Sequence, residues 1–532
     1  MKRRLLIASF LSYGAALPAQ DIEVLSEMKG RPLPRAYFER LQQQPDAFEL
    51  KDGWRRKLAA AQATASAVEG TLPLVIIPAL FADSESPDAS ISSSALESRL
   101  FDPASFNTVT SYFSEVSRGK LNISGRVTDW TPTTLTRATV VGTSFGLGVE
   151  SKTRDWLREA IAKADAKIDF GQFDNDGPDK IPNSGDDDGR VDGAAFLFRE
   201  VDASCGGPGI WPHRSRFSGG QETAQPTNDP RPNGGVIVVD DYMVMGARNC
   251  GGNRPLDVNV FAHETGHILG LPDYYDLTGG ILREQRRWVV GCWEIMSAGS
   301  WGCGAGPHQG IVDPPHMGAY TKGIMGWVEP KVVGTAIKPE QHTLRPAHSS
   351  GDALRIPLSA TEYLLVEYRA KQGHDSGLPA SGLLVYHIQT GRPFLPCPTC
   401  PRTYSYALLE ADSDSALVRV ETAGGNRGAG TDAFGAARTK LDDTTIPSTR
   451  LNDGTSTWVK LSGMIIDAVQ GIARVTVSLA PSRFTMARLA SALGMTPLPN
   501  EDQLLLDAAG NGNGRFDVGD FRAYARIQAE SN

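Results

Sequence analysis

The run HETGHILGLPD, which begins at His263, constrains this chain more than any other feature of its sequence. On a helix, positions i and i+4 lie on one face, so the imidazoles of His263 and His267 can both reach one metal ion. Glu264 lies on the side where a water molecule would meet that metal, and its carboxylate can take the water's proton as a general base. The pattern therefore predicts a helix that carries a catalytic metal site.

The residues after the second histidine supply a third ligand. Gly270 stands where the helix must stop and turn, a position with positive φ that glycine adopts without steric cost. The turn brings Asp273 to the position at which the metzincin pattern HExxHxxGxxH holds its third ligand. Two histidines, one carboxylate and an open position are typical of catalytic zinc. The alternative is a distant downstream glutamate, Glu284 or Glu294, but the spacing of Gly270 and Asp273 favours the first scheme.

Four other residues are candidates for supporting roles at such a site. Met296, in the run CWEIMS, is predicted to form a Met-turn, an apolar floor beneath the metal, although a lone methionine is more often a core residue. His213, Tyr275 and Tyr320 could stabilise an oxyanion, but packing is at least as common a role for these residue types.

The runs HETGHILGLPDYYD and WEIMSAGSW resemble the immune inhibitor A family of secreted bacterial metalloproteases. Further stretches are similar to that family: SYFSEVSRGKL from Ser111, WPH from Trp211, AYTKGIMGW from Ala319, and the β region from Gly377. The resemblance covers about residues 72–465. It implies a zinc endopeptidase that acts on protein or peptide substrates, is made with a signal peptide and a propeptide, and carries calcium and a β-domain.

The beginning of the chain has the pattern of an export signal. Three basic residues at 2–4 precede an apolar stretch that is too short to span a bilayer, and small residues follow it. The even number of cysteines, six, agrees with export and with disulfides. Sequence order favours the pairs Cys205–Cys250, Cys292–Cys303 and Cys397–Cys400, although other pairings stay open.

Length and pattern divide the chain into several parts. At 532 residues it is too long for one small core. Strands and helices alternate from residue 72 to about 330, and short alternating runs typical of an all-β sandwich follow. We predict an α+β multidomain protein: a metzincin-like α/β zinc-protease domain, an all-β sandwich domain and a small helix-loop-helix calcium module. The predicted parts are a signal peptide at 1–20, a propeptide at 21–70, the catalytic domain at 71–335, the β-sandwich at 336–480 and the calcium module at 481–532. An ordinary N-terminal extension is the alternative to the propeptide.

An acidic run from Phe173 to Asp192 predicts a calcium site. It reads FDNDGPDKIPNSGDDDGRVD, and closely spaced carboxylates on a tight loop repel one another unless a cation binds. A solvated acidic loop is the alternative. The predicted ligands are Asp174, Asp176, Asp188 and Asp192.

The tail run DAAGNGNGRFDVGD resembles an EF-hand or dockerin-type calcium loop, with Gly514 at the sharp turn. In that register the first ligand position falls on Ala509, and the last position lacks the usual glutamate. We predict a structural calcium site, with a polar loop that binds no metal as the alternative. The predicted ligands are Asn511, Asn513, Asp517 and Asp520.

Charge and hydropathy exclude other classes of protein. A formal net charge of −8 argues against a nucleic-acid partner, and no apolar run is long enough for a membrane span. We expect a secreted monomer, with periplasmic retention left open. A non-peptidase zinc hydrolase and a non-catalytic calcium-binding adhesin remain as alternative functions.

Overall fold

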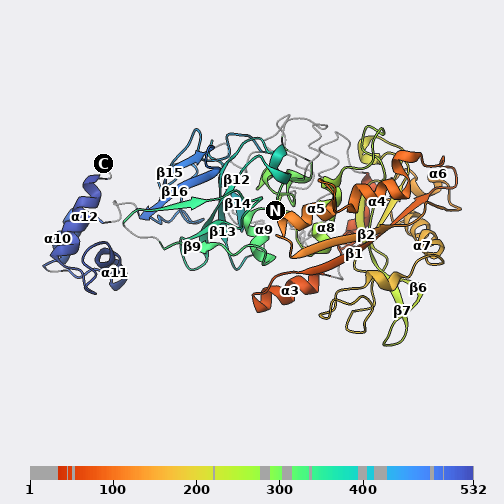
Figure 1. Ribbon diagram of the computed structural model, residues 1–532, viewed down its shortest axis with the longest axis horizontal. Coiled ribbons are helices and arrows are strands. Elements are labelled where there is room, and N and C mark those ends of the chain that lie inside the picture. Colours follow the sequence, from red (N-terminus) through yellow and green to blue (C-terminus); the bar gives the residue numbers. More distant parts are fainter. Residues whose placement is uncertain are drawn as a thin grey trace, which may run out of the picture. The chain divides into compact units, whose positions relative to one another are not determined.

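The computed structural model of the chain divides into two compact units (Figure 1). Unit 1 comprises Met1–Gly53, Pro73–Glu97 and Gly125–Leu256, and unit 2 comprises Trp54–Leu72, Ser98–Ser124 and Asp257–Asn532. The structure describes residues 34–44, 46–50, 54–219, 222–275, 288–301, 303, 314–334, 338–392, 404–412, 428–479, 484–494 and 496–530. The predicted signal peptide therefore lies outside the described residues.

Unit 1 is built around a six-stranded sheet with the order β2-β1-β4-β8-β5, in which β3 also pairs with β1. Strands β1, β4 and β8 are parallel, and β5 runs antiparallel to β8 at the edge of the sheet. Val75, Ile77 and Phe196 are completely buried, as expected for central parallel strands that are covered on both faces. The strands are β1 (Gly70–Leu80), β2 (Leu121–Val127), β3 (Thr131–Pro132), β4 (Ala194–Phe198), β5 (His213–Arg216) and β8 (Asp241–Gly246).

Helix α7 (Thr153–Ala164) packs on the core of unit 1, to which it contributes Trp156 and Ile161. It lies in the part of the chain for which alternating strands and helices are predicted. The remaining elements of this half of the sequence are α2 (Arg35–Gln43), α4 (Ser93–Phe101), α6 (Arg137–Val141), β6 (Gln225–Pro230) and β7 (Val236–Val239).

Four helices of unit 2 precede its two sheets in the sequence. Helix α8 (Val258–Ile268) contains the HETGH run, as the sequence predicted. The other three helices are α3 (Arg55–Thr64), α5 (Val109–Val116) and α9 (Ala319–Ile324). Helix α5 begins with a capping box, in which Thr108 and Ser111 satisfy each other's backbone N–H groups. The indole N–H of Trp327, which follows α9, donates to the carbonyl oxygen of Val68, which follows α3, at 2.8 Å.

Two sheets follow within unit 2. A five-stranded sheet has the order β14-β13-β12-β11-β9, and a three-stranded sheet has the order β10-β16-β15. Leu364 and Val385 of the first sheet and Val475 of the second belong to one hydrophobic core. The alternating run Val418-Arg419-Val420, which predicts a further strand of the sandwich, lies outside the described residues. The strands are β9 (Lys331–Val332), β10 (Glu340–Leu344), β11 (Ala353–Pro357), β12 (Glu362–Arg369), β13 (Gly382–Gln389), β14 (Tyr406–Leu408), β15 (Val459–Asp467) and β16 (Ile472–Leu479). The chain is thus a mixed α/β protein with several sheets.

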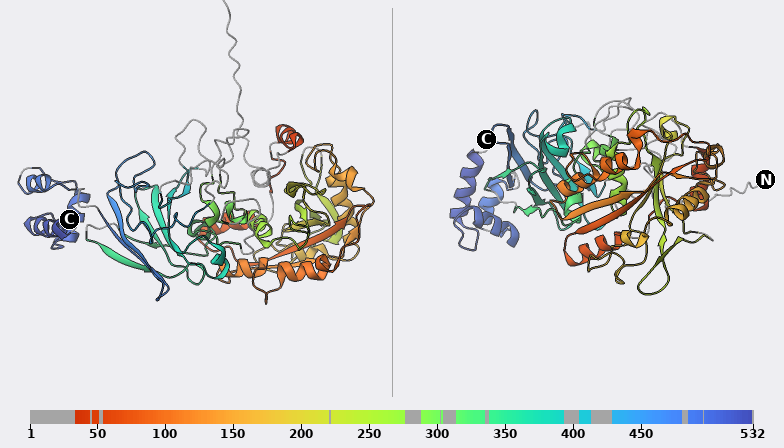
Figure 2. Two further views of the ribbon diagram at one scale, coloured as in Figure 1. Left: turned by 90° about the horizontal axis from the view of Figure 1, so that it is seen from above. Right: turned by 45° about the vertical axis from the view of Figure 1, so that its right-hand side comes forward.

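The tail consists of three helices, which stay together in both views of Figure 2. They are α10 (Met486–Ala492), α11 (Asn500–Ala509) and α12 (Val518–Glu530). Helix α11 was not predicted, although Pro499 precedes it and acidic residues occupy its first turn, which are both helix-start signals. Within the described residues, no helix has the length and apolar character needed to cross a membrane.

Candidate metal centre

Helix α8 brings the predicted metal ligands and the predicted base to one buried place in unit 2. His263, Glu264 and His267 are each at most 6% exposed, and so is Asp273, which follows the helix. Burial of so many ionisable groups is costly unless they are paired or bind a metal. These four ionisable side chains therefore form a buried polar site beside the apolar residues of helix α8.

Three ligand atoms converge in this site. The Nε2 atoms of His263 and His267 are 3.1 Å apart, and they lie 3.2 and 3.3 Å from Oδ1 of Asp273. Tetrahedral zinc bound at about 2.0–2.1 Å to each atom would require separations of about 3.3 Å. The three side chains that the sequence predicted as ligands thus fit one ion of this size.

The outer nitrogen of each ring fixes which nitrogen faces the other ligands. Nδ1 of His263 donates to the carbonyl oxygen of Ile295 at 2.7 Å, and Nδ1 of His267 donates to that of Leu271 at 2.8 Å. A carbonyl can only accept, so each neutral ring carries its proton on Nδ1 and directs the lone pair of Nε2 inward. Two such lone pairs cannot bond each other, and a cation is the group that satisfies both.

The electrostatics of the site favour positive charge. Burial alone would lower the pKa of His263, but the carboxylates of Asp273 and Glu264 raise it above its ordinary value. The donor set of two imidazoles and a carboxylate matches zinc better than a hard cation such as Ca²⁺.

Gly270 forms the predicted turn, with φ of +91°. Its position is also crowded, since a Cβ atom there would lie 3.2 Å from the Cα of Arg55 and from Cδ2 of Leu58 on α3. The turn lets Leu271 N bond to Gly266 O, which returns the chain toward the metal ligands. Glycine is therefore required here for its backbone conformation and for its small size.

Met296 packs beneath helix α8. A Cβ atom at Gly266, between the two histidines, would lie 3.0 Å from Cε of Met296 and closer still to its sulfur. The carbonyl of Met296 accepts the backbone N–H of Tyr274 at 2.7 Å, which ties this turn to the segment that carries Asp273. Met296 thus lies against the helix between the two histidines, and its role as the floor of a metal site stays a prediction.

The alternative ligand Glu294 is engaged elsewhere. Its carboxylate accepts hydrogen bonds from Gly318 N at 2.6 Å and from the Thr321 hydroxyl at 2.8 Å, and it is not among the convergent ligand atoms. The other alternative, Glu284, lies outside the described residues.

The acidic loop of unit 1 brings three of its four predicted ligands together. Asp174, Asp176 and Asp192 form a group with convergent oxygens, whereas Asp188 is not part of that group and donates its N–H to Asp176 at 3.2 Å. Burial and the charges of Asp188, Asp187 and Asp176 raise the pKa of Asp174 to about 7. Asp187 accepts backbone N–H groups of the loop. This role was not predicted, because three consecutive aspartates at 186–188 do not reveal which of them points into the loop.

The tail loop is organised around an aspartate that the sequence register missed. Asp507 accepts the N–H groups of Asn513 and Gly514 at 2.7 and 2.8 Å. It therefore takes the first position of the loop, which the EF-hand spacing assigns to Ala509. The side-chain amides of Asn511 and Asn513 donate to Asp517, and Asp520 accepts from Asn511 N. Among the described residues, the convergent groups of metal-ligand atoms do not include this loop.

The three oxyanion candidates occupy packed positions. His213, on β5, bonds the carbonyl of Trp211 through Nδ1 at 2.7 Å, and burial lowers its pKa to about 3. Tyr275 is completely buried against Trp288, and burial raises the pKa of Tyr320 to about 12. Each environment favours the packing role.

Two of the three predicted disulfides are present. They join Cys205 to Cys250 and Cys292 to Cys303. The predicted pair Cys397–Cys400 lies outside the described residues.

A helix-borne HExxH motif, a glycine turn and a third carboxylate are together typical of metallopeptidase catalytic domains. Residues 91–328 match the family described as immune inhibitor A peptidase M6, catalytic domain. The resemblance predicted from the sequence is therefore confirmed over these residues.

Two curated relatives are similar to part of this chain. Immune inhibitor A of Bacillus thuringiensis subsp. alesti is 29% identical over 244 residues, which are 43% of this chain and 34% of that protein. Pre-pro-metalloprotease PrtV of Vibrio cholerae serotype O1 is 28% identical over 210 residues, 37% of this chain and 21% of that protein. The match thus spans about a third or less of each relative's length.

Proposed function

We propose that this chain is a secreted zinc endopeptidase that hydrolyses peptide bonds in extracellular proteins. The observation that carries the proposal is the convergence of Nε2 of His263, Nε2 of His267 and Oδ1 of Asp273 within 3.3 Å of one another, next to Glu264. The names of the relatives, which include a pre-pro-metalloprotease, support both the activity and a processed precursor.

In this proposal His263, His267 and Asp273 hold one zinc ion. Zinc supplies Lewis acidity, which acidifies a water molecule and polarises the scissile carbonyl group. Glu264 accepts the proton of the attacking water as general base and passes it to the leaving amine as general acid. Met296 supports the helix between the two histidines, and the Nδ1 hydrogen bonds of both rings keep their tautomers fixed.

The rest of the architecture belongs to the same proposal. The fold is a metzincin-like catalytic domain followed by a β-sandwich and a small helical module, preceded in the precursor by a signal peptide and a propeptide. Calcium bound by the loop at 174–192 would neutralise carboxylates whose burial and mutual repulsion raise the pKa of Asp174. The tail loop at 507–520 is proposed as a second, structural calcium site. Secretion to the medium or to a periplasm is consistent with the two disulfides.

The test compares casein cleavage by the purified, mature wild type and by Glu264→Gln, with the zinc content of both. A matched control is Glu362→Gln, because Glu362 is a buried glutamate of β12 that bonds His387 and Asn452. We expect one zinc ion in each protein, cleavage by the wild type and the control, and none by Glu264→Gln.

The other outcomes identify the alternatives. If the wild type holds zinc and cuts neither casein nor mixed peptides, the peptidase proposal is wrong and ester and amide substrates come next. If the wild type binds no zinc, the proposed zinc site is wrong, and the alternative function of a non-catalytic calcium-binding adhesin is favoured.

A further inference from the structure

We infer that Glu294 and Arg369 are positioning residues of the metal centre. Together they hold the turn at residues 293–296, whose Ile295 carbonyl accepts the Nδ1 proton of His263. This inference rests on the proposed function, because it gives these residues a role in metal binding by His263. Every group involved lies in unit 2.

The turn at residues 293–296 contacts helix α8 at two points. Ile295 O bonds Nδ1 of His263 at 2.7 Å, and Met296 packs against Gly266, between the two histidines. If the turn moved, His263 would lose the acceptor that fixes its tautomer and its ring orientation. Its Nε2 could then carry the proton, and a protonated nitrogen cannot bind a metal.

Glu294 holds the turn from within. The residue is completely buried, and Oε1 accepts the N–H of Met296 at 3.3 Å. Its other oxygen accepts from Gly318 N, from the Thr321 hydroxyl and, at 3.3 Å, from the Tyr406 hydroxyl. A buried carboxylate with this many donors is a rigid anchor, because moving it would leave several polar groups unsatisfied.

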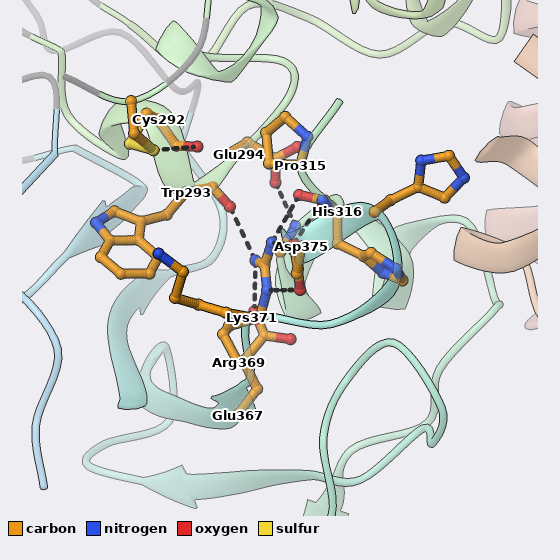
Figure 3. A network of polar contacts seen from close by, with 12 residues as sticks. Cys292, Trp293, Glu294, Pro315, His316, Glu367, Arg369, Lys371 and Asp375 are labelled. Carbon is orange, nitrogen blue, oxygen red and sulfur yellow. Dashed lines mark hydrogen bonds and ion pairs between the residues drawn. A yellow bond between two sulfur atoms is a disulfide. The ribbon is translucent and has the colours of Figure 1, made fainter. Parts of the chain in front are cut away.

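Arg369 holds the turn from strand β12, as Figure 3 shows. Its Nη1 donates to Trp293 O at 2.8 Å and to Glu367, and its Nη2 donates to His316 O at 3.3 Å. The remaining donors, Nε and the second hydrogen of Nη2, form a bidentate pair with Asp375. All five N–H donors of this completely buried guanidinium are therefore used, which fixes its orientation.

Trp293 is held at its backbone carbonyl and at its indole N–H. Arg369 binds its carbonyl oxygen, and Asp432 accepts its indole N–H at 2.8 Å. Ile295 follows two residues later, so restraint of Trp293 and Glu294 restrains the carbonyl that His263 uses. The strands after the catalytic region thus contribute to the geometry of the metal ligands without touching the metal.

The first test measures zinc affinity by chelator competition in Glu294→Gln. This variant keeps the size of the side chain and replaces one acceptor oxygen with a donor. We expect zinc binding to weaken by about 10- to 100-fold, as for other outer-sphere partners of a metal-bound histidine. Glu362→Gln changes a buried glutamate of β12 whose carboxylate bonds His387 and Asn452, and it should bind zinc as the wild type does. Circular dichroism and thermal unfolding check that both variants are folded.

Arg369→Lys is the second variant. Lysine keeps the charge but lacks the planar fork that reaches Trp293 and Asp375 together. We expect weaker zinc binding here too, and we expect excess zinc to restore casein cleavage by both variants, because Glu264 is unchanged. A merely structural role would lower thermal stability without this zinc-dependent rescue.

Three results would overturn the inference. Folded Glu294→Gln and Arg369→Lys that bind zinc as tightly as the wild type would exclude a positioning role. Failure of both variants to fold, with Glu362→Gln folded, would assign the network to general stability. A wild type that neither binds zinc nor cuts casein would instead refute the proposed function itself.

Discussion

Gly266 and Met296 are in such close contact that a Cβ atom at position 266 would lie 3.0 Å from Cε of Met296 and closer still to its sulfur. The glycine stands between the two histidines of helix α8, where a helix ordinarily disfavours it. Packing of the methionine under the metal ligands explains why this position carries no side chain.

The first prediction concerns this contact. Gly266→Ala should force Met296 and the histidines apart, with a cost of about 1–3 kcal/mol in the free energy of unfolding and a loss of zinc affinity. Thermal unfolding and chelator competition measure the two effects. Gly323→Ala on α9 is the control, because a Cβ atom there would meet only Val328 O at 3.9 Å. Equal thermal stability and equal zinc affinity of Gly266→Ala and Gly323→Ala would contradict the prediction.

The second prediction concerns metal removal. Treatment with 1,10-phenanthroline should abolish casein cleavage, and added zinc should restore it. Asp273→Asn removes the charge of the third ligand, so its zinc affinity should fall by more than the roughly 10- to 100-fold typical of an outer-sphere change. The exposed Asp453 gives the matched control Asp453→Asn, which should bind zinc normally. Full activity of Asp273→Asn without added zinc would assign the third ligand elsewhere.

The third prediction concerns acid stability and uses a group far along the chain from the metal ligands. Burial lowers the pKa of His213 from 6.5 to about 3 in the folded protein. Between these values the unfolded chain binds more protons than the folded one, so stability is complete above pH 6.5 and falls as the pH falls.

The loss should approach about 1.4 kcal/mol per pH unit in that range. Asparagine cannot titrate. Between pH 7 and pH 5, the free energy of unfolding of His213→Asn should therefore fall by about 2 kcal/mol less than that of the wild type. Urea unfolding at several pH values measures the difference. If the free energies of unfolding of the two proteins fall equally with pH, His213 is not the group that causes the loss of stability in acid.

The fourth prediction concerns maturation. Helix α3 lies within the predicted propeptide, yet Trp54 is completely buried and Arg55 and Leu58 crowd Gly270 of the metal loop. We expect the mature enzyme to retain this helix, so that any processing occurs before Trp54. Mass spectrometry of the active protein identifies its first residue. An active enzyme that begins after residue 70 would show that α3 is dispensable.

The sequence predicted the parts of the site that are local in the chain. The helix, the turn at Gly270 and the positions of His263, His267 and Asp273 follow from spacing and from the backbone freedom of glycine. The alternation of strands and helices after residue 72, and the short strands after about residue 336, were likewise predicted, because both depend on local patterns of apolar residues.

Contacts between distant residues could not be predicted in this way. Trp293 and Arg369 are 76 positions apart, and no spacing rule joins a backbone carbonyl to a guanidinium on another strand. The sequence therefore indicates only one possible role for Glu294, that of an alternative metal ligand. In the tail, counting from Gly514 selected Ala509, whereas the chain uses Asp507 two residues earlier because helix α11 brings that carboxylate to the loop.

The anchoring of Trp293 has a practical consequence for protein engineering. The stretch matched by the peptidase family ends at residue 328, whereas Arg369, Tyr406 and Asp432 come later in the chain. A minimal protease cut at the family boundary would keep every ligand and the general base but lose three of the groups that brace them. We expect such a fragment to need the strands that follow, supplied in the same chain or as a separate polypeptide, before its histidines can capture zinc tightly.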